Sequence, residues 1–211
     1  MRSFSIVVCN DSAFLPKACA EGFDYLLFDP SEAKSLKWNG LQLHEVFDES
    51  EESIGVASRQ AITKLNMIRK TAHIFFFNRQ SELLLQKMPA KSEFFSELLC
   101  PSAFGIFGID EAPAQAALRI SSEWLGIGES LYYLGKIKSF SDESKEFAYC
   151  FMCVSDQKPK SASGFEPDFY SLKEIEKMNP MWFSPPLKLE LKRFLGKMKR
   201  ELSSQNELRG K

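Results

Sequence analysis

The chain has 211 residues, of which 44% are hydrophobic and 26% charged, a composition that excludes an intrinsically disordered protein and suits one domain with a substantial core. Its 27 basic and 28 acidic side chains give a formal net charge of −1, so no overall field favours nucleic acid or an anionic membrane. Any phosphate site must therefore be built locally. No apolar run approaches the roughly 18 residues of a membrane span, and we expect a cytoplasmic protein.

Residues 1–42 are predicted to form an extension that packs on the domain. Short apolar runs at residues 4–9 and 23–28 predict two strands. The first run precedes the small residues 18–20, which loosely resembles a signal peptide and its cleavage site. Lys17 and other polar residues interrupt that stretch, however, and six apolar residues suit a buried strand better than a secretory segment.

From residue 43 the pattern becomes denser and predicts one domain that ends at residue 202, followed by a flexible tail at 203–211. The clearest helix is rich in alanine and is closed by Gly126 as C-cap, and Ser58 is the predicted N-cap of an earlier helix. The order of elements predicts an α/β sandwich. In chain order, the predicted elements are a strand at 43–47, a helix at 58–65, strands at 73–77, 82–86 and 104–109, a helix at 112–125, strands at 135–140, 147–154 and 169–170, and helices at 172–178 and 187–202.

The five cysteines, at positions 9, 19, 100, 150 and 153, are odd in number and scattered, which indicates reduced thiols in a reducing compartment. Cys150 and Cys153 form a C-x-x-C pair within the strand predicted at 147–154. Because residues three apart in a strand point to opposite faces, the pair cannot chelate one metal. We therefore predict two buried structural cysteines.

Around the helix at 112–125 lies a regularly spaced set of glycine, acidic and basic residues. The set comprises Gly105, then Glu111 after five residues, Arg119 after seven more, and Glu123, Gly126 and Ile127. This spacing resembles the Nudix box, G-x5-E-x7-R-E-U-x-E-E-x-G-U, where U is a bulky aliphatic residue. The resemblance implies a Nudix fold, which is a mixed β-sheet sandwiched between α-helices, and a loop, helix and loop that hold a divalent metal against a diphosphate.

The metal-binding face of that helix departs from the family pattern. The box glutamates after the arginine share one helical face, and here their positions carry Ile120, Glu123 and Trp124. A hard cation such as Mg²⁺ or Mn²⁺ needs carboxylate ligands, so metal-dependent hydrolysis is expected to be weak or lost, with Glu123 as the remaining ligand if any activity persists. The Ile/Trp pair allows two interpretations. Either this face of the helix has been converted to core, or it forms a pocket wall that places Trp124 against a ligand.

The resemblance narrows to the isopentenyl-diphosphate-isomerase-like branch of this superfamily over roughly residues 43–200, on the segments 43–57, 73–87 and 181–185. A gap-free match places the catalytic cysteine of that branch on Phe104 and a metal-binding histidine on Ile106. Cys100 lies four residues before the cysteine position, and Glu146 alone is acidic at 145–147, where the later metal-binding glutamates fall. His44 and His73 match no ligand position of that branch and are expected to be core or surface histidines.

The function implied by the resemblance is action on, or binding of, a nucleoside or isoprenoid diphosphate. The roles implied are catalytic for Glu123, Glu111 and Arg119, with Arg119 orienting Glu123, and substrate-binding for Lys87, Lys91 and Trp124. One alternative is a non-catalytic binding or interaction module that could include a homodimer or a protein partner. A second alternative is an isomerase-like enzyme, which lacks the cysteine at its expected position. Phe104 replaces a glycine of the family pattern, and this bulk predicts a filled pocket.

Overall fold

The computed structural model describes residues 6–8, 25–27, 43–92, 95–128, 130–160 and 166–209. Its centre is a mixed seven-stranded sheet in the order β11-β6-β5-β10-β9, with β7 beside β6 and β8 beside β5. Strand β5 runs parallel to β10, and the other pairs are antiparallel. The strands are β5 (Arg69–Phe77), β6 (Glu82–Lys87), β7 (Leu99–Cys100), β8 (Ala103–Ile106), β9 (Tyr132–Phe140), β10 (Lys145–Val154) and β11 (Glu166–Ser171).

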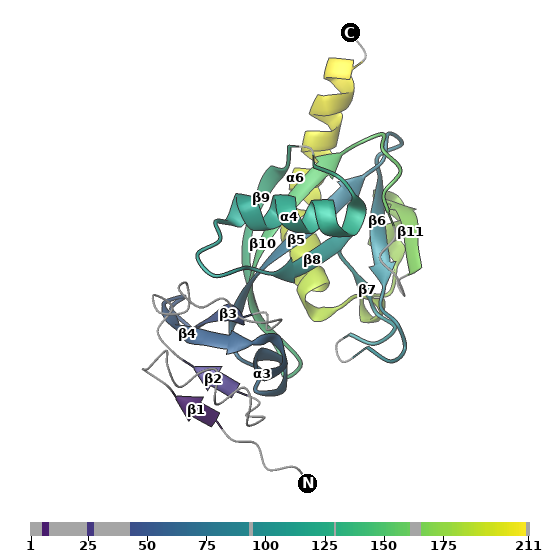
Figure 1. Ribbon diagram of the computed structural model, residues 1–211. Coiled ribbons are helices and arrows are strands. Elements are labelled where there is room, and N and C mark those ends of the chain that lie inside the picture. Colours follow the sequence, from purple (N-terminus) through teal and green to yellow (C-terminus); the bar gives the residue numbers. More distant parts are fainter. Residues whose placement is uncertain are drawn as a thin grey trace.

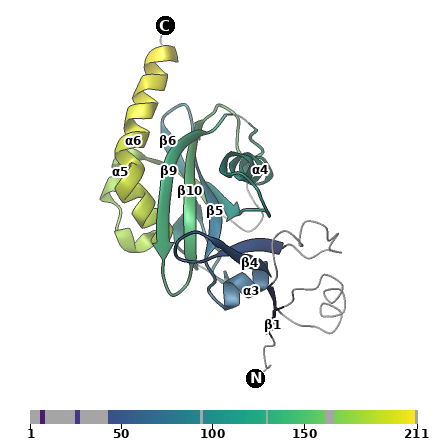
Figure 2. The ribbon, with the colours of Figure 1, turned by 90° about the vertical axis from the view of Figure 1, so that its left-hand side faces the viewer.

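Helices cover both faces of this sheet. Helix α4 (Pro113–Leu125) lies on one face, and α5 (Leu172–Lys177) and α6 (Pro185–Arg209) lie on the other (Figure 2). Side chains alternate along β5, so Phe76 packs in the core layer under α4 while Phe75 packs in the layer under α6. A central strand buried on both faces therefore reads as an unbroken apolar run, and the predicted α/β/α sandwich is confirmed.

A smaller layer lies beside the main sheet (Figure 1). It contains the hairpin β3 (Leu43–Phe47) and β4 (Ser53–Ser58), helix α3 (Arg59–Lys64), and the parallel pair β1 (Ile6–Val8) and β2 (Tyr25–Leu27). The acidic turn of the hairpin is attached to the main sheet through Glu51, whose carboxylate contacts Lys70, Lys136 and Tyr149. Burial would raise the pKa of Glu51, but hydrogen bonds from Lys136 and Tyr149 outweigh it and hold this pKa below its usual range.

Several local predictions are confirmed. The side chain of Ser58 caps α3 by accepting from the backbone N–H of Ala61, and Gly126 closes α4 in the left-handed region with φ 70°. Cys150 and Cys153 are buried in the two opposite core layers. The structure also differs from the predicted elements in several places. Strands β4 and β7 were not predicted, and the strands β5, β9, β10 and β11 begin before their predicted starts. Strand β8 stops at Ile106, where the chain turns toward α4, and α6 continues past residue 202 to Arg209. The residues 18–20 lie outside the described ranges.

No helix within the described ranges is both long enough and apolar enough to cross a membrane.

The packing of α6 on the sheet leads to a stability prediction at Gly135. This residue has φ 149°, and a Cβ added to it would lie 2.7 Å from a ring carbon of Phe194 on α6. We expect Gly135→Ala to lower the free energy of unfolding by about 1–3 kcal/mol, because the added methyl overpacks this contact and the backbone conformation disfavours a side chain. Gly128→Ala is the control, since a Cβ there meets nothing within 4 Å. Equal thermal melts of the two variants would contradict the prediction.

Candidate functional site

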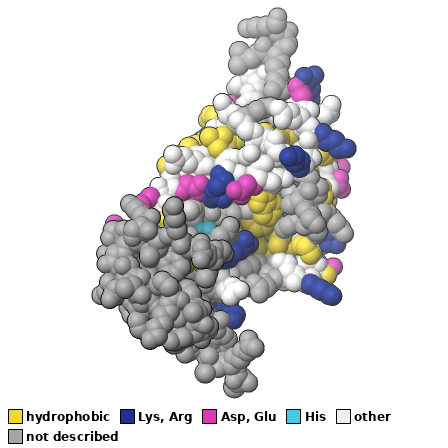
Figure 3. All heavy atoms as spheres, viewed as in Figure 1, with side chains coloured by type: hydrophobic (Ala, Val, Ile, Leu, Met, Phe, Trp, Pro, Cys, Tyr) yellow, Lys and Arg dark blue, Asp and Glu magenta, His cyan; other side chains and the backbone are white. Residues whose placement is uncertain are grey.

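A cavity of about 770 Å³ opens beside α4, at the edge where β8 borders β5. Side chains from α3, β3, β5, β8, α4 and the segment after β6 line it, and its size is typical of a pocket for a small molecule. On the same face, acidic and basic side chains form a row above a gathering of hydrophobic side chains (Figure 3). The cavity brings together groups that are far apart in the sequence.

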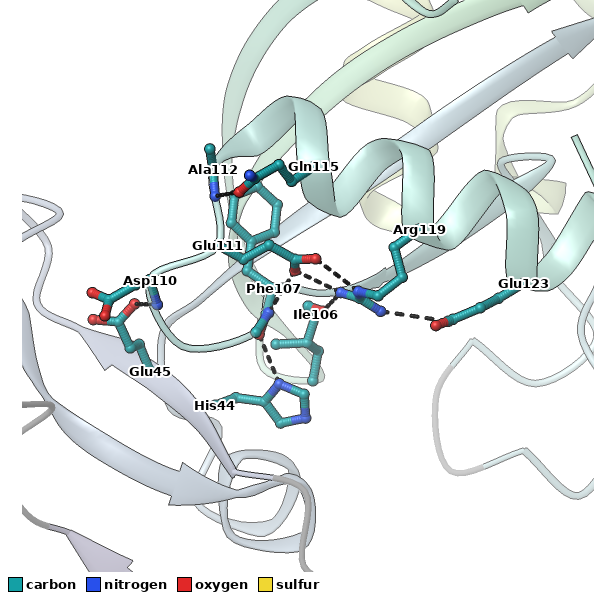
Figure 4. A network of polar contacts seen from close by, with 11 residues as sticks. His44, Glu45, Ile106, Phe107, Asp110, Glu111, Ala112, Gln115, Arg119 and Glu123 are labelled. Carbon is teal, nitrogen blue, oxygen red and sulfur yellow. Dashed lines mark hydrogen bonds and ion pairs between the residues drawn. The ribbon is translucent and has the colours of Figure 1, made fainter. Parts of the chain in front are cut away.

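Glu111, just before α4, and Arg119, in the middle of α4, form an ion pair (Figure 4). Arg119 donates from Nε to Glu111 Oε1 at 2.8 Å and from Nη2 to Oε2 at 2.7 Å, and it also donates to the carbonyl of Ile106 at 3.0 Å. The N–H of Gly108 donates to Glu111 Oε2 at 2.7 Å. Burial alone would raise the pKa of Glu111, but these donors outweigh it and keep its pKa low. The pair ties the loop before α4 to the helix.

Only two of the three predicted catalytic residues lie at the cavity. Arg119 and Glu123 line it, whereas Glu111 does not. Glu123 is exposed and lies 3.4 Å from Arg119 Nη1, so Arg119 binds mainly Glu111 and touches Glu123 only weakly. Among the predicted substrate-binding residues, Lys91 and Trp124 line the cavity. Lys87 is exposed at the end of β6 and is not among the cavity-lining residues.

The two apolar positions on the helix face have different roles. Ile120 is 1% exposed and belongs to the core layer under α4, so the prediction that this position has become core is confirmed. Trp124 is half-buried and lies with its ring centre 5.0 Å from that of Phe104, which also lines the cavity. The expectation that Phe104 fills the pocket is wrong, because its ring packs on Trp124 and forms a wall of an open cavity.

The residues on α4 do not fit the divalent metal that the resemblance implies. Of the helix positions that would supply carboxylates, only Glu123 carries one, and both oxygens of Glu111 are already engaged by Arg119. Within the described part of the chain, no group of three or more His, Cys, Asp or Glu side chains could hold a metal ion. A hard cation would find too few oxygen ligands here to offset the loss of its bound water.

Two exposed cations at the cavity, Arg59 on α3 and Lys91 after β6, form no ion pair with any described residue. Arg119 adds a third positive group at the same cavity, although Glu111 balances its charge. His44 also lines the cavity and is hydrogen bonded through Nδ1 to the carbonyl of Phe107 at 2.7 Å. Burial lowers the pKa of His44, so it is neutral at pH 7 and Nδ1 is the donor.

The inner end of the cavity is a buried cluster of charged groups. Arg69, Thr71 and His73 alternate along β5 and share one face of the strand, and Glu146 on β10 is in register with Arg69. His73 donates from Nδ1 to Glu190 Oε1 on α6 at 2.5 Å, and its Nε2 lies 3.7 Å from Glu146 Oε2. All but Glu190 line the cavity.

The cluster keeps His73 positively charged. Burial alone would lower the pKa of His73, but the carboxylates of Glu190 and Glu146 outweigh it and raise the pKa to about 10. Burial would likewise raise the pKa of Glu146, yet His73 and Arg69 hold it below its usual range. The cluster therefore combines two basic side chains, Arg69 and His73, with two acidic ones, Glu146 and Glu190.

The charged cluster at the inner end of the cavity was not predicted from the sequence. His73 was expected to be an ordinary core or surface histidine, and it is buried but lies between two carboxylates at the cavity. The sequence feature that indicates the cluster is the alternation of polar residues 69, 71 and 73 at the start of an otherwise apolar strand. Cys100 also lines the cavity although its sequence position does not match the isomerase cysteine, and burial raises the pKa of its thiol to about 12.

No protein-family model and no curated protein matches the chain. Among solved structures, the MutT protein from Methanosarcina mazei Go1 superposes with a TM-score of 0.54 and 19% identity, over 64% of this chain and 94% of that protein. The DR0079 protein from Deinococcus radiodurans superposes with a TM-score of 0.59 and 18% identity, over 72% of this chain and 98% of that one. Such likeness establishes the fold, which is the Nudix α/β/α sandwich.

The raised pKa of His73 predicts how stability depends on pH. A histidine with a folded pKa of about 10 and an ordinary value of 6.5 stabilises the fold fully below pH 6.5 and loses this contribution as pH rises toward 10. We expect the free energy of unfolding to fall by up to about 1.4 kcal/mol per pH unit between pH 7 and 8.5. Urea unfolding should show this slope in the wild type and in His44→Gln, but not in His73→Gln. A flat wild-type profile would refute the assignment.

The different burial of the two apolar helix positions predicts different tolerance to a carboxylate. Ile120→Glu should cost about 3 kcal/mol or more, because it places an unpaired charge in the core. Trp124→Glu should cost about 1–2 kcal/mol, because this side chain borders the cavity and its carboxylate can stay hydrated. Thermal melts distinguish the two cases, and an Ile120→Glu protein as stable as the wild type would contradict the assignment of this position to the core.

Proposed function

We propose that the protein binds a phosphoanhydride in the cavity beside α4, and that metal-dependent hydrolysis by this site is weak or lost. The observation that carries the proposal is the composition of the cavity. Exposed cations reach it from α3 and from the segment after β6, aromatic side chains form a wall, and α4 contributes a single carboxylate. Such a site can hold a diphosphate but is poorly equipped to hold the metal that would activate water.

The phosphate end of the ligand is assigned to Arg59 and Lys91. Neither side chain has an ion-pair partner among the described residues, so their charge is available to an anion. Arg119 contributes less, because Glu111 takes two of its hydrogen bonds. Its task is to hold the loop at Gly108 in place, which shapes the entrance of the cavity.

The chemistry available without a metal is limited. Glu123 is exposed to solvent, and the phosphoryl group would lack the cation that neutralises charge as the P–O bond breaks. A binding module that does not hydrolyse its ligand is therefore the first alternative. The isomerase-like alternative has one observation in its favour, since Cys100 and Glu146 line the same cavity. Against it, the raised pKa of Cys100 keeps its thiol protonated.

The cation assignment predicts the effect of three lysine and arginine substitutions on ligand binding. Lys91→Ala and Arg59→Ala should each weaken the binding of a nucleoside diphosphate by about tenfold, because each removes one charged contact to phosphate. Lys87→Ala is the matched control and should leave the affinity unchanged, since Lys87 lies outside the cavity. Calorimetric titration gives the three dissociation constants. A loss of affinity in Lys87→Ala alone would contradict the proposed site.

A hydrolysis screen addresses the enzymatic part of the proposal. With Mg²⁺ or Mn²⁺ present, nucleoside, sugar, dinucleotide and isoprenoid diphosphates should be turned over slowly or not at all. Product formation is measured by chromatography, with Glu123→Gln as the variant that removes the last helix carboxylate. Fast turnover that disappears in Glu123→Gln would show that one carboxylate suffices and that the protein is an active hydrolase.

A further inference from the structure

The inner end of the cavity contains buried polar atoms without partners. Glu146 Oε1 and Thr71 Oγ1 are buried and accept or donate no hydrogen bond within the described residues. Thr71 is close enough to help lower the pKa of Glu146, yet the two side chains do not form a well-aligned hydrogen bond. Both residues line the cavity, so a group that enters the cavity can reach this end. Buried acceptors are normally satisfied, which indicates that the contents of the cavity supply a donor.

The charges around Glu146 indicate what kind of donor fits. Its Oε2 faces His73, while Arg69 lies in register on the neighbouring strand and Glu190 lies on the far side of His73. The two carboxylates are already balanced by the two cations. A ligand group with a further positive charge would lose its hydration here without gaining a new anionic partner. A neutral N–H or O–H group, by contrast, can donate to Oε1 of Glu146 and leaves the charge balance of the cluster unchanged.

The wall next to this end is aromatic. The ring of Phe104 packs edge-on against His73, with ring centres 6.0 Å apart, and lies tilted by 45° against Trp124, with ring centres 5.0 Å apart. These three rings therefore run from the inner end toward α4. Flat aromatic surfaces favour a planar heterocycle, which can stack on them and present its edge to a hydrogen-bonding group. A flexible alkyl chain could fill the same space, but it would offer no donor to Glu146.

We infer that the phosphoanhydride is a nucleotide whose base carries an exocyclic amino group, and that Glu146 Oε1 accepts a hydrogen bond from this amino group at the inner end of the cavity. The inference rests on the proposed function, which places the phosphates at Arg59 and Lys91. Thr71 can donate or accept, and so it complements the ring atom next to the amino group. A base with a carbonyl in place of the amino group would place a hydrogen-bond acceptor next to the Glu146 carboxylate, which is itself an acceptor.

Matched nucleotides test the inference without any variant. ADP and IDP differ by amino against carbonyl on the purine, CDP and UDP differ in the same way on the pyrimidine, and GDP differs from IDP by the amino group alone. In calorimetric titrations of the wild type, the amino member of at least one pair should bind about tenfold more tightly or better, as expected for one hydrogen bond to a charged acceptor. Isopentenyl diphosphate, which has no donor on its alkyl chain, should bind more weakly than that nucleotide.

Two variants assign the preference to one atom. Glu146→Gln places an amide at the inner end and should reduce the amino-to-carbonyl ratio to about one or invert it. Glu190→Gln is the control. This substitution also removes a carboxylate that contacts His73, but Glu190 does not line the cavity. The variant should therefore keep the wild-type amino-to-carbonyl ratio. If Glu146→Gln does not fold, Thr71→Val and the wild-type ratios still decide the matter, since Thr71→Val should weaken the preferred nucleotide more than its partner.

The outcomes separate the two proposals. Equal affinities within all three pairs, or isopentenyl diphosphate binding as tightly as ADP, GDP and CDP, would overturn the amino-group inference while phosphoanhydride binding stands. Loss of the preference in Glu190→Gln, with no change in Glu146→Gln, would also overturn it. Failure of all nucleotides, isopentenyl diphosphate and inorganic pyrophosphate to bind would overturn the proposed function, and the inference with it.

Discussion

The close approach of helix α4 to strand β8 at Gly105 is the contact on which the site depends. A Cβ added to Gly105 would lie 3.0 Å from Cδ1 of Ile120, so glycine lets the helix sit this deep without displacing the end of that side chain. Ile120 fills the space with 1% of its surface exposed. This packing stabilises the loop and helix that the Nudix spacing predicts, and it also uses a position where the family pattern has a carboxylate. The loop and helix thus have the geometry that the spacing predicts, while Ile120 belongs to the core at a position where the family pattern has a carboxylate.

The charged groups near the cavity fall into three sets. Near α4, Glu111 is bound to Arg119, and Glu123 is left in solvent. At the entrance, the exposed side chains of Arg59 and Lys91 bring positive charge to the cavity. At the inner end, His73 and Arg69 balance Glu146 and Glu190, which allows four charged groups to be buried together. A cavity with a cationic entrance and a neutral inner end suits a ligand that is charged at one end only.

The fold was predictable because its signals are local, whereas the inner site was not. The apolar run of β5, the alanine-rich helix with Gly126 as its cap, and the spacing from Gly105 to Arg119 each depend on neighbouring residues. The cluster at His73 depends on pairing across 117 residues with Glu190, and no local pattern encodes such a distance. Phe104 was misjudged for the same reason: its size suggested a filled pocket, but the rotation of its ring toward Trp124 is a tertiary property.

The central claim is that the cations of the protein itself, and no metal held by α4, bind the phosphates. The most direct measurement is a calorimetric titration of the wild-type protein with a nucleoside diphosphate, performed once with EDTA and once with millimolar Mg²⁺. We expect measurable binding in both titrations, with dissociation constants that agree within a few-fold, because Arg59 and Lys91 contact the phosphates directly. Binding that requires Mg²⁺ and vanishes with EDTA would contradict the claim, since it would show that a metal joins the ligand to the protein.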